Sequence, residues 1–267
     1  MTRYIAYTPQ SLGSESQQVS AIQESLPPWA STKYLVCDGK YGSSTESAVK
    51  QFQEASGLSP DGVVGPVTGS ALGVWRSLEK GFDASHWNEI LWDSIPFDIK
   101  FCILKATEGV GYEDPKFRDS VARATALSMS IGAYHYTKFK NSPYLEAASF
   151  LDAVGSQGVS RLYLDLECRT SGLNAKAIST WVESFLASVK GAKPLCRVGV
   201  YTSRNYMAEI GLQQYTDISK YDLWAADWVK QPYVYPWKSW DIWQYSSTGS
   251  VHWAEGDIDL NYRIKSI

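Results

Sequence analysis

The sequence predicts an α/β protein in which a small three-helix domain precedes a larger βα barrel. Residues 16–73 contain a repeated turn that is followed each time by a helical pattern, whereas from Gly81 onward short apolar runs alternate with helical stretches. The second pattern is typical of a largely parallel sheet wrapped by helices. A chain of 267 residues is long enough for one small and one large core. We therefore expect a first domain over residues 1–78, with its core at about 16–73, and a second domain over residues 79–267.

The small domain begins with a helix and two similar turns. Val19, Ile22 and Leu26 recur at helical spacing, and Pro27-Pro28 stops this helix. The motif D-G-x-x-G-x-x-T then occurs twice, at residues 38–45 and 61–68. Asp-Gly favours a tight turn, the second glycine allows backbone conformations closed to other residues, and each copy leads into a helix.

Both of these helices carry boundary signals and an apolar face. In the first, Ser43 and Glu46 match a capping box and Gly57 ends the helix. Its expected apolar face consists of Ala48, Val49, Phe52 and Ala55. In the second, Pro66 suits the first helical position, and we expect the helix to continue to Lys80. Its expected apolar stripe consists of Val67, Ala71, Trp75 and Leu78.

This segment resembles the peptidoglycan-binding domain of many wall hydrolases, in which a helix precedes repeated DGxxGxxT turns around an A-V-x-x-F-Q helix. Residues 48–53 read Ala-Val-Lys-Gln-Phe-Gln here. The resemblance implies a groove beside the turns that holds wall peptide or glycan. Every residue of the motif also has a structural role in a turn or in the core, so the sequence assigns no individual wall contact.

The larger domain contains seven candidate strands. They span residues 81–85, 100–106, 130–136, 161–167, 197–201, 222–226 and 240–245. Several of them end in polar or acidic residues, which is where barrel enzymes carry their active sites.

The clearest chemical feature is the apolar strand at residues 162–167, which ends in Asp165 and Glu167. Strand alternation places both carboxylates on one face, roughly 6.6 Å apart along the strand. Leu164, Leu166 and Cys168 then point the other way, toward covering helices. Repulsion and partial burial would raise one pKa and produce the acid and ionised partner that glycosidic cleavage requires. A bare D-x-E pattern is more often a pair of solvated acids at a strand end, so its neighbours decide between the two readings.

Two further acids stand at the ends of other elements. Asp83 ends the first barrel strand, and Asp259 lies near the C-terminus in Gly-Asp-Ile-Asp-Leu-Asn. Asp257 competes with Asp259 for this place, because alternation gives the two residues the same facing.

The second domain resembles glycoside hydrolase family 25 over essentially residues 81–267. The matching motifs occur in family order and lie at residues 81–88, 105–109, 132–136, 163–167, 200–202, 223–226, 243–245 and 259–261. The resemblance implies an irregular, flattened, TIM-like βα barrel with an acidic groove at the C-terminal ends of its strands. Ala84 departs from the family pattern, where a branched apolar residue is common, and this puts packing in question rather than chemistry.

The resemblance also implies roles for individual residues. Glu167 corresponds to the general acid that protonates the glycosidic oxygen, and Asp165 to its electrostatic partner. Asp83 and Asp259 correspond to flanking carboxylates. The residues expected at the substrate are Tyr136, Tyr201, Trp224, Gln244 and Trp87. Attack by the substrate's own acetamido group and direct attack by a carboxylate both remain open.

Other residues near these motifs keep two readings. Trp243 and Trp253 lie beside the expected groove, and each has a core reading as well. Lys105 and Glu108 form a structural ion pair or contact substrate, with neither alternative favoured.

The implied function is that of an N-acetylmuramidase, which cleaves the β-1,4 bond between N-acetylmuramic acid and N-acetylglucosamine. Because the start of the chain has no apolar signal core, we expect a phage endolysin made in the host cytoplasm that reaches the wall after release. The alternative is a non-catalytic wall-binding or structural protein. A chitin-directed hydrolase is disfavoured, because the acids that such enzymes carry upstream of a D-x-E strand are missing.

Composition sets further expectations. A net charge of −3 without a basic block argues against a nucleic-acid partner. No apolar stretch approaches the roughly 20 residues needed to span a bilayer. The four cysteines and three histidines are scattered, so we expect free thiols, no metal and no cofactor. We expect a monomer whose partner is bacterial peptidoglycan.

Overall fold

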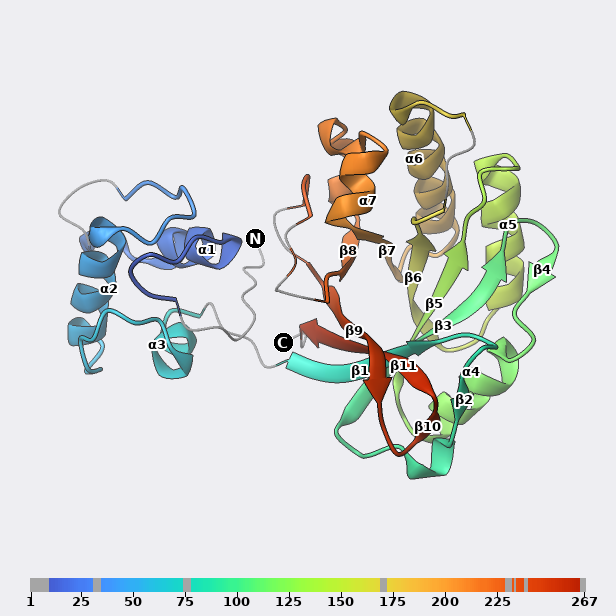
Figure 1. Ribbon diagram of the computed structural model, residues 1–267, viewed down its shortest axis with the longest axis horizontal. Coiled ribbons are helices and arrows are strands. Elements are labelled where there is room, and N and C mark those ends of the chain that lie inside the picture. The colour runs from blue at the N-terminus through green and yellow to red at the C-terminus, as the bar shows by residue number, and fades with distance from the viewer. Residues whose placement is uncertain are drawn as a thin grey trace. The chain divides into compact units, whose positions relative to one another are not determined.

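The computed structural model describes residues 10–30, 35–73, 78–168, 172–228, 232, 234–237 and 240–264. The chain forms two compact units, one of Met1–Leu78 with Ile264–Ile267 and one of Glu79–Arg263 (Figure 1). Each unit has its own hydrophobic core and is described by itself.

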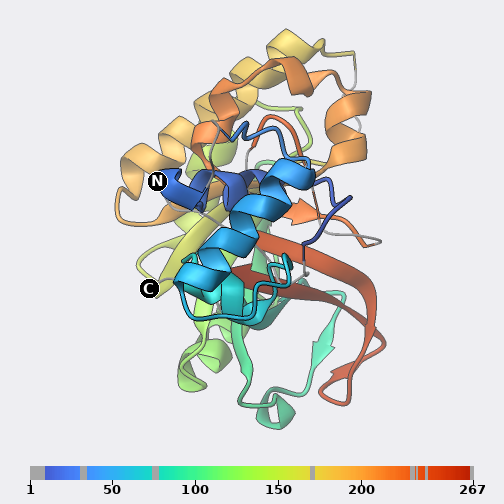
Figure 2. The same cartoon turned by 90° about the vertical axis from the view of Figure 1, so that its left-hand side faces the viewer.

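The first unit contains three α-helices, which are drawn in blue and cyan in Figure 2. They are α1 (Gln17–Ser25), α2 (Ser43–Ala55) and α3 (Pro66–Ala71), and a short 3-10 helix, η1 (Pro28–Ala30), follows α1. Ser16 caps α1, because its side chain accepts a hydrogen bond from the backbone N–H of Val19. The shared core consists of Val19, Ile22, Leu26, Ala30, Tyr41, Ala48, Val49, Phe52 and Val64.

A buried glutamine holds each of the two repeated turns. Gln53 Nε2 donates to Asp61 Oδ1 at 2.7 Å and to Thr68 Oγ1 at 3.0 Å, and Gln53 Oε1 accepts from the backbone N–H of Gly62 at 2.9 Å. Gln23 makes the equivalent four-part contact with the first turn, through Asp38, Gly39, Lys40 and Thr45. One side chain thus satisfies the Asp, the Gly and the Thr of each D-G-x-x-G-x-x-T copy, which explains why the motif contains those residue types.

Several details of the expected helices are wrong. The N-cap of α2 is Gly42 without a side-chain hydrogen bond, so Ser43 and Glu46 form no capping box, and Glu46 instead pairs with Lys50 at 3.1 Å. Ala55 and Ala71 are exposed. The last helix ends at Ala71 rather than Lys80, because Gly73 takes a left-handed conformation (φ +67°) that helices do not continue through. Residues 78–80 open a strand instead, and Trp75 lies outside the described residues.

The second unit is an eight-stranded closed barrel. Around it, in sheet order, stand β1 (Leu78–Ala84), β11 (Asp257–Ile264), β9 (Ile242–Ser250), β8 (Asp222–Ala226), β7 (Arg197–Ser203), β6 (Val159–Asp165), β5 (Ser130–Tyr136) and β3 (Ile99–Glu108). Pairing of β1 with β3 closes the ring. Short β4 (Tyr112–Glu113) pairs with β3, and β2 (Glu89–Ile90) pairs with β10 (Ala254–Glu255).

The barrel is irregular in its last strand. The pairs from β1 through β3, β5, β6, β7 and β8 to β9 are parallel, whereas β11 runs antiparallel to β9. A strand that returns after a short connection must pair antiparallel, because a parallel return needs a long crossover. The strand β11 was not among the seven expected ones, and its first residues lie beside the end of β9.

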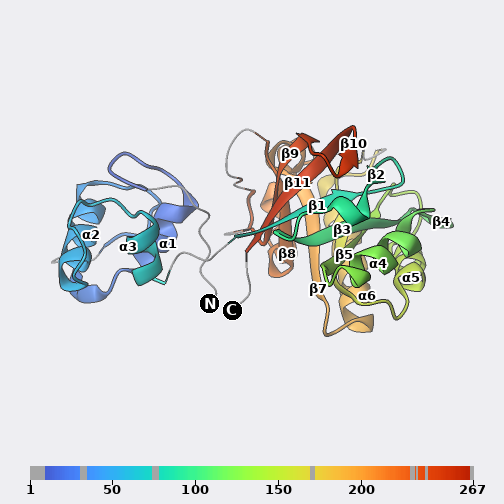
Figure 3. The ribbon, with the colours of Figure 1, turned by 90° about the horizontal axis from the view of Figure 1, so that it is seen from below.

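Helices follow several of the strands. They are α4 (Phe117–Ala126), α5 (Pro143–Val154), α6 (Ala175–Ala192) and α7 (Arg204–Glu209), with 3-10 helices η2 (Trp92–Ser94), η3 (Leu212–Gln214) and η4 (Asp217–Lys220). Figure 3 shows α4, α5 and α6 away from the β9–β11 hairpin, where α4 and α5 pack against β3, and α6 packs against α5, β6 and β7. Within the described part of the chain, no helix is long and apolar enough to cross a membrane.

The barrel interior is a packed core beneath the strand ends. Its buried side chains are Phe101, Ile103, Tyr163, Tyr201, Trp224, Ala226 and Ile242. Gly199 makes room for Tyr163, because a Cβ at this position would stand 2.6 Å from the tyrosine ring and 2.5 Å from the carbonyl oxygen of Asp222. The interior therefore supports the site above it rather than forming a channel.

Candidate active site

The four acids expected from the sequence gather at one end of the barrel. Asp83 is the penultimate residue of β1, Asp165 is the last residue of β6, and Glu167 follows it by two positions. Asp259 lies near the start of β11, and since β11 is antiparallel, this start lies beside the C-terminal end of β9. Asp83 and Asp259 share a hydrogen bond, and burial followed by the negative charge of Asp83 raises the pKa of Glu167.

Asp165 and Glu167 differ in their surroundings. Asp165 is only 6% exposed, and its Oδ1 has no hydrogen-bond partner among the described residues. Burial, followed by the negative charge of Glu167, holds the pKa of Asp165 well above its usual range. Glu167 is exposed by accessible area, yet the protein atoms crowded around its carboxyl, followed by the charge of Asp83, also raise its pKa. Leu164, Leu166 and Cys168 are buried on the opposite face, as strand alternation predicts.

Two amide side chains hold Asp83. Gln244 Nε2 donates to Asp83 Oδ2 at 3.0 Å and Asn261 Nδ2 donates to the same oxygen at 2.7 Å. The orientation of both amides follows from indole groups, which only donate: Trp228 Nε1 donates to Gln244 Oε1 at 3.0 Å and Trp224 Nε1 donates to Asn261 Oδ1 at 2.8 Å. The amide nitrogens must therefore face Asp83, and both stabilise its ionised form.

Asp259 carries the proton of the Asp83–Asp259 pair. Burial, followed by the charge of Asp83 and the hydrogen bond to it, raises the pKa of Asp259 to about 9. Burial also raises the pKa of Asp83, but the hydrogen bonds from Gln244, Asn261 and Asp259 oppose this shift. Two carboxyls this close cannot both ionise at low cost, so the amide-bonded one takes the charge. Asp257 is exposed, because register shifts on both sides of Leu260 interrupt simple alternation along β11.

Lys105 stands beside the acids and is itself paired. Its Nζ donates to Glu108 Oε2 at 2.6 Å, and Glu108 also contacts Lys138. The structure therefore contains the ion pair between Lys105 and Glu108. The charge of Lys105 nevertheless lowers the pKa of both Asp165 and Glu167, so this lysine partly opposes the repulsion between the acids.

The expected aromatic and amide contacts divide into supporting and accessible groups. Trp224 is 2% exposed and Gln244 is also buried, so they hold Asn261 and Asp83 from beneath rather than offering a free surface to a sugar. Tyr201 is buried and its hydroxyl donates to Gln244 Oε1 at 3.0 Å. Tyr136 is half-buried with Lys105 Nζ 5.2 Å from its ring centre, and Trp87 is exposed.

The structure also places Trp253 and Trp243, for which the sequence left a core position and a groove position open. Trp253 is buried against Phe82, with ring centres 5.0 Å apart, so its core reading is correct. Trp243 is half-buried and its indole donates to the backbone oxygen of Asp227 at 2.8 Å.

Sequence reasoning missed Asn261 and Trp228 as parts of the site. The signal that could have found Asn261 is its place in the Asp-Leu-Asn motif at residues 259–261, since alternation along β11 is irregular at Leu260. Trp228 follows β8 by two residues and carries no comparable signal.

A cavity of about 270 Å³ lies apart from the acids, between the β1–β2 connection and α4. Its lining includes Asn88, Lys116 and Arg123 but none of the four carboxylates. Among the described residues, no group of three or more His, Cys, Asp or Glu side chains is arranged to hold a metal ion.

The acids provide the chemistry of a glycoside hydrolase. A glycosidic bond breaks when a carboxylic acid protonates the leaving oxygen while a nearby negative charge stabilises the oxocarbenium-like centre. The barrel end presents raised-pKa acids next to a carboxylate that two amides keep ionised, which meets both requirements. Fold and site together define a barrel glycosidase.

Comparison with known proteins identifies the family. Residues 82–253 match the model of glycosyl hydrolases family 25, and residues 15–72 match that of a peptidoglycan binding domain. The chain is 30% identical to Lysozyme M1 of Streptomyces globisporus over 229 residues, which cover 79% of this chain and 74% of the relative. The chain belongs to glycosyl hydrolases family 25, and it is a lysozyme-type muramidase of cell-wall peptidoglycan that carries an N-terminal peptidoglycan-binding domain.

Solved structures agree with this assignment. The bacterial lysozyme from Streptomyces coelicolor has a TM-score of 0.62 and 28% identity, covering 70% of this chain and 92% of that one. The CTP1L endolysin has a TM-score of 0.59 and 25% identity, covering 69% of this chain and 66% of that one.

Proposed function

We propose that this muramidase cleaves the β-1,4 bond between N-acetylmuramic acid and N-acetylglucosamine, with Glu167 as the general acid. Glu167 is the one of the four acids that is exposed, so its carboxyl can reach a substrate oxygen, and its raised pKa keeps it protonated at higher pH than a free glutamate. This combination of access and raised pKa is the observation that supports the assignment most directly.

Of the other three acids, Asp83 supplies the negative charge that stabilises the positive centre developing at the sugar. Asp83 is held ionised by Gln244 and Asn261, and Asp259 keeps a proton in its hydrogen bond to Asp83. Asp165 is buried with one oxygen unpaired, so it orients either the acetamido group of the substrate or the developing charge. Tyr136 and Trp87 are the substrate contacts on the accessible side.

The bond is tested by mass spectrometry of digested sacculi. Purified peptidoglycan is incubated with the protein and the fragments are reduced with borohydride. New reducing ends on muramic acid support the proposal, whereas new ends on glucosamine show a different bond. Binding without any release of fragments supports the alternative of a non-catalytic wall-binding protein.

We also propose that the protein is a phage endolysin, a monomer made in the host cytoplasm that uses no metal or cofactor and binds neither nucleic acid nor membrane. Its likeness to the CTP1L endolysin and its wall-binding domain support this reading. Expression inside a bacterium should cause lysis only after the membrane is permeabilised, for example with chloroform. Lysis without that treatment contradicts the proposal, as does a dimer in analytical ultracentrifugation.

A further inference from the structure

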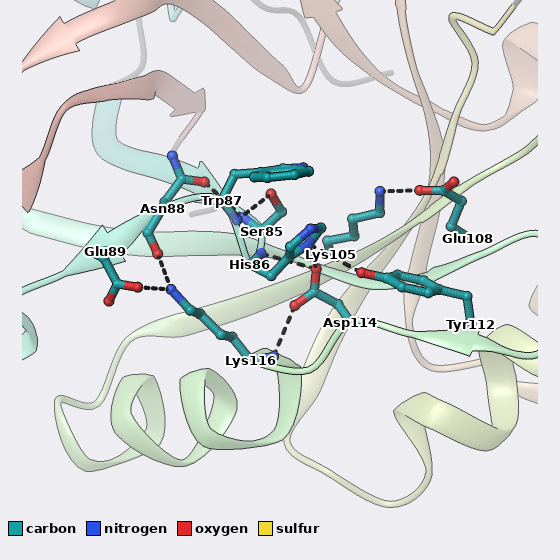
Figure 4. Close-up of polar contacts among 10 residues, drawn as sticks. All are labelled: Ser85, His86, Trp87, Asn88, Glu89, Lys105, Glu108, Tyr112, Asp114 and Lys116. Atoms are coloured by element: carbon teal, nitrogen blue, oxygen red, sulfur yellow. Dashed lines mark hydrogen bonds and ion pairs between the residues drawn. The ribbon is translucent and has the colours of Figure 1, made fainter.

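The connection from β1 to β2 exposes a large aromatic side chain that the core does not use. Trp87 is 83% exposed, and its ring centre lies 4.4 Å from that of His86. On the other side of His86 lies Tyr112 of β4, with ring centres 6.1 Å apart (Figure 4). These three side chains form a row of rings, here called the aromatic ledge. Exposed aromatic rings that are held in place mark recognition surfaces more often than accidents of packing.

A buried carboxylate holds the centre of this ledge. Asp114 is 2% exposed, and its Oδ2 accepts the backbone N–H of His86 at 3.0 Å and lies 2.7 Å from His86 Nδ1. Its Oδ1 accepts the backbone N–H of Lys116 at 3.0 Å. Nδ1 of His86 therefore faces Asp114, and Tyr112 Oη lies 3.2 Å from the same nitrogen, whereas Nε2 makes no hydrogen bond with the described part of the chain. The ring is thereby oriented before any ligand arrives.

The aromatic ledge is continuous with the acids. Lys105 Nζ lies 5.9 Å from the ring centre of Tyr112 and 5.2 Å from that of Tyr136. Tyr136 is in turn the register partner of Asp165 across β5 and β6. A strand bound at the acids therefore has a path over Lys105 and Tyr112 to His86 and Trp87.

The charges around the ledge are already paired within the protein. Lys116 contacts Glu89 and donates to the backbone oxygen of Asn88 at 2.9 Å, and Lys105 pairs with Glu108 (Figure 4). The aromatic ledge therefore offers ring faces and a hydrogen-bonding ring nitrogen, while the lysines beside it are already paired. Such a surface suits the uncharged faces of amino sugars better than the charged groups of a stem peptide.

We propose that Trp87, His86 and Tyr112 form a distal glycan subsite, in which a sugar remote from the cleaved bond stacks on Trp87 while His86 Nε2 makes a hydrogen bond with a hydroxyl or acetamido group of the sugar. Asp114 is a positioning residue that fixes His86. This inference rests on the proposed cleavage of the glycan strand at Glu167, and it adds a preference for long strands over short ones.

The test compares Trp87→Ala with Phe97→Ala. Phe97 is likewise exposed, at 89%, but it precedes β3 and therefore lies at the opposite end of the barrel strands from the acids. The substrates are glycan strands freed of stem peptides by an amidase, either long or trimmed to a tetrasaccharide. Losing a stacking contact should raise the KM of Trp87→Ala for long strands by on the order of tenfold, with a much smaller rise for the tetrasaccharide. Phe97→Ala should match the unmodified protein on both.

A double-mutant cycle tests the row as a unit. If the His86 ring holds the Trp87 ring in place, His86→Ala should also raise the KM for long strands. The rise in KM of the double variant should then be smaller than the product of the two single rises. Asp114→Asn should raise KM, as His86→Ala does, and should change kcat much less. A substitution that merely destabilised the protein would not separate the two constants in this way. Circular dichroism and thermal unfolding confirm that each variant is folded.

Several outcomes overturn the proposal. Equal KM values for Trp87→Ala and the unmodified protein on long strands remove the subsite, and equal losses in Trp87→Ala and Phe97→Ala show a general surface effect. A loss that appears only on strands that retain stem peptides makes the peptide the ligand instead of the glycan. If no strand is cleaved at all, the proposed function fails. Binding of long strands to Glu167→Gln and to its combination with Trp87→Ala then still decides about the aromatic ledge.

Discussion

The two ends of the barrel treat charge in opposite ways. At the N-terminal ends of the parallel strands, Arg197 contacts both Asp222 and Asp241. Arg263 Nε donates to Glu79 Oε2 at 3.0 Å, and its Nη1 donates to Ser130 Oγ at 2.7 Å. Each of these acids therefore has an arginine partner, which is the arrangement that stabilises a fold.

At the C-terminal ends, four acids gather, and Lys105, the cation that acts on Asp165 and Glu167, is already paired with Glu108. The pKa of every one of the four is raised, with burial as the main cause. Like charges that are held together without matching cations lower the stability of the fold. At the other end of the same barrel, Asp222, Asp241 and Glu79 each have an arginine partner. The difference marks the C-terminal end as functional and the N-terminal end as structural.

The largest expected effect is that of Glu167→Gln. Glutamine keeps the size of the side chain but cannot give a proton to the leaving oxygen, so kcat should fall by about a hundredfold to ten-thousandfold. Binding to intact sacculi should persist, and thermal unfolding followed by circular dichroism serves as the folding control for the barrel. For the unmodified protein, activity should decline as pH rises through the raised pKa of the acid, although the limb reports the coupled cluster rather than one residue. Lysis by the variant at a near-normal rate would contradict the role of Glu167.

The second prediction separates the members of the Asp83–Asp259 pair. Asp83→Asn removes the negative charge that Gln244 and Asn261 stabilise. It also introduces an amide N–H group next to the N–H donors of these two residues, so kcat/KM should fall by about a hundredfold or more. Asp259→Asn replaces a carboxyl that already carries a proton, and it keeps a donor toward Asp83, so the loss should stay within about tenfold. The reverse order of the two losses would place the proton on Asp83.

The structural end should respond in stability rather than in catalysis. Arg197→Met leaves Asp222 and Asp241 without their shared partner, and we expect the free energy of unfolding in urea to drop by about 1–3 kcal/mol. At temperatures where the variant is folded, kcat should change by less than about twofold. A large loss of kcat in fully folded protein would erase the contrast between the two ends.

The acids should also make stability depend on pH. The folded pKa of Asp259, about 9, exceeds its ordinary value of 3.8, so the folded state binds more protons than the unfolded state between these limits. Stability is therefore greatest below the ordinary pKa and is lost as pH rises toward 9, by at most about 1.4 kcal/mol per pH unit for one group. Asp259→Asn should flatten this slope in urea titrations at several pH values. An identical slope in the variant would mean that Asp259 is not the titrating group.

The smallest expected effect is that of chelation. Carboxyl groups and amide donors supply the acid and the electrostatic stabilisation that glycosidic cleavage needs, so EDTA should leave the rate of wall digestion unchanged. The assay compares digestion before and after dialysis against the chelator. Loss of activity that zinc restores would assign the site a metal.

The sequence alone was sufficient for the fold class and for the shared facing of Asp165 and Glu167, whereas the position of Asp259 depends on β11, an antiparallel strand that was not among the expected ones. A strand has a period of two, so Asp165 and Glu167 had to share a face whatever surrounded them, and the ends of parallel strands had to meet at one edge. The turns of the first unit could also be predicted from the D-G-x-x-G-x-x-T motif, because Asp-Gly favours a tight turn whatever surrounds it. Local rules failed at helix boundaries, because the N-cap of α2 is Gly42 rather than Ser43, and α3 ends before Gly73, whose φ is positive.

Only the tertiary structure decided how the acids are held and which of them carries a proton. Asp83 meets Gln244 and Asn261 across 161 and 178 residues of sequence, and the indoles of Trp224 and Trp228 then orient both amides. The same holds for Asp114, which reaches back 28 residues to fix His86 beside Trp87. A residue type and a strand period specify which face a side chain occupies, but hydrogen bonding and burial depend on neighbours that the barrel brings together only when it closes, and these neighbours set the pKa values of the site.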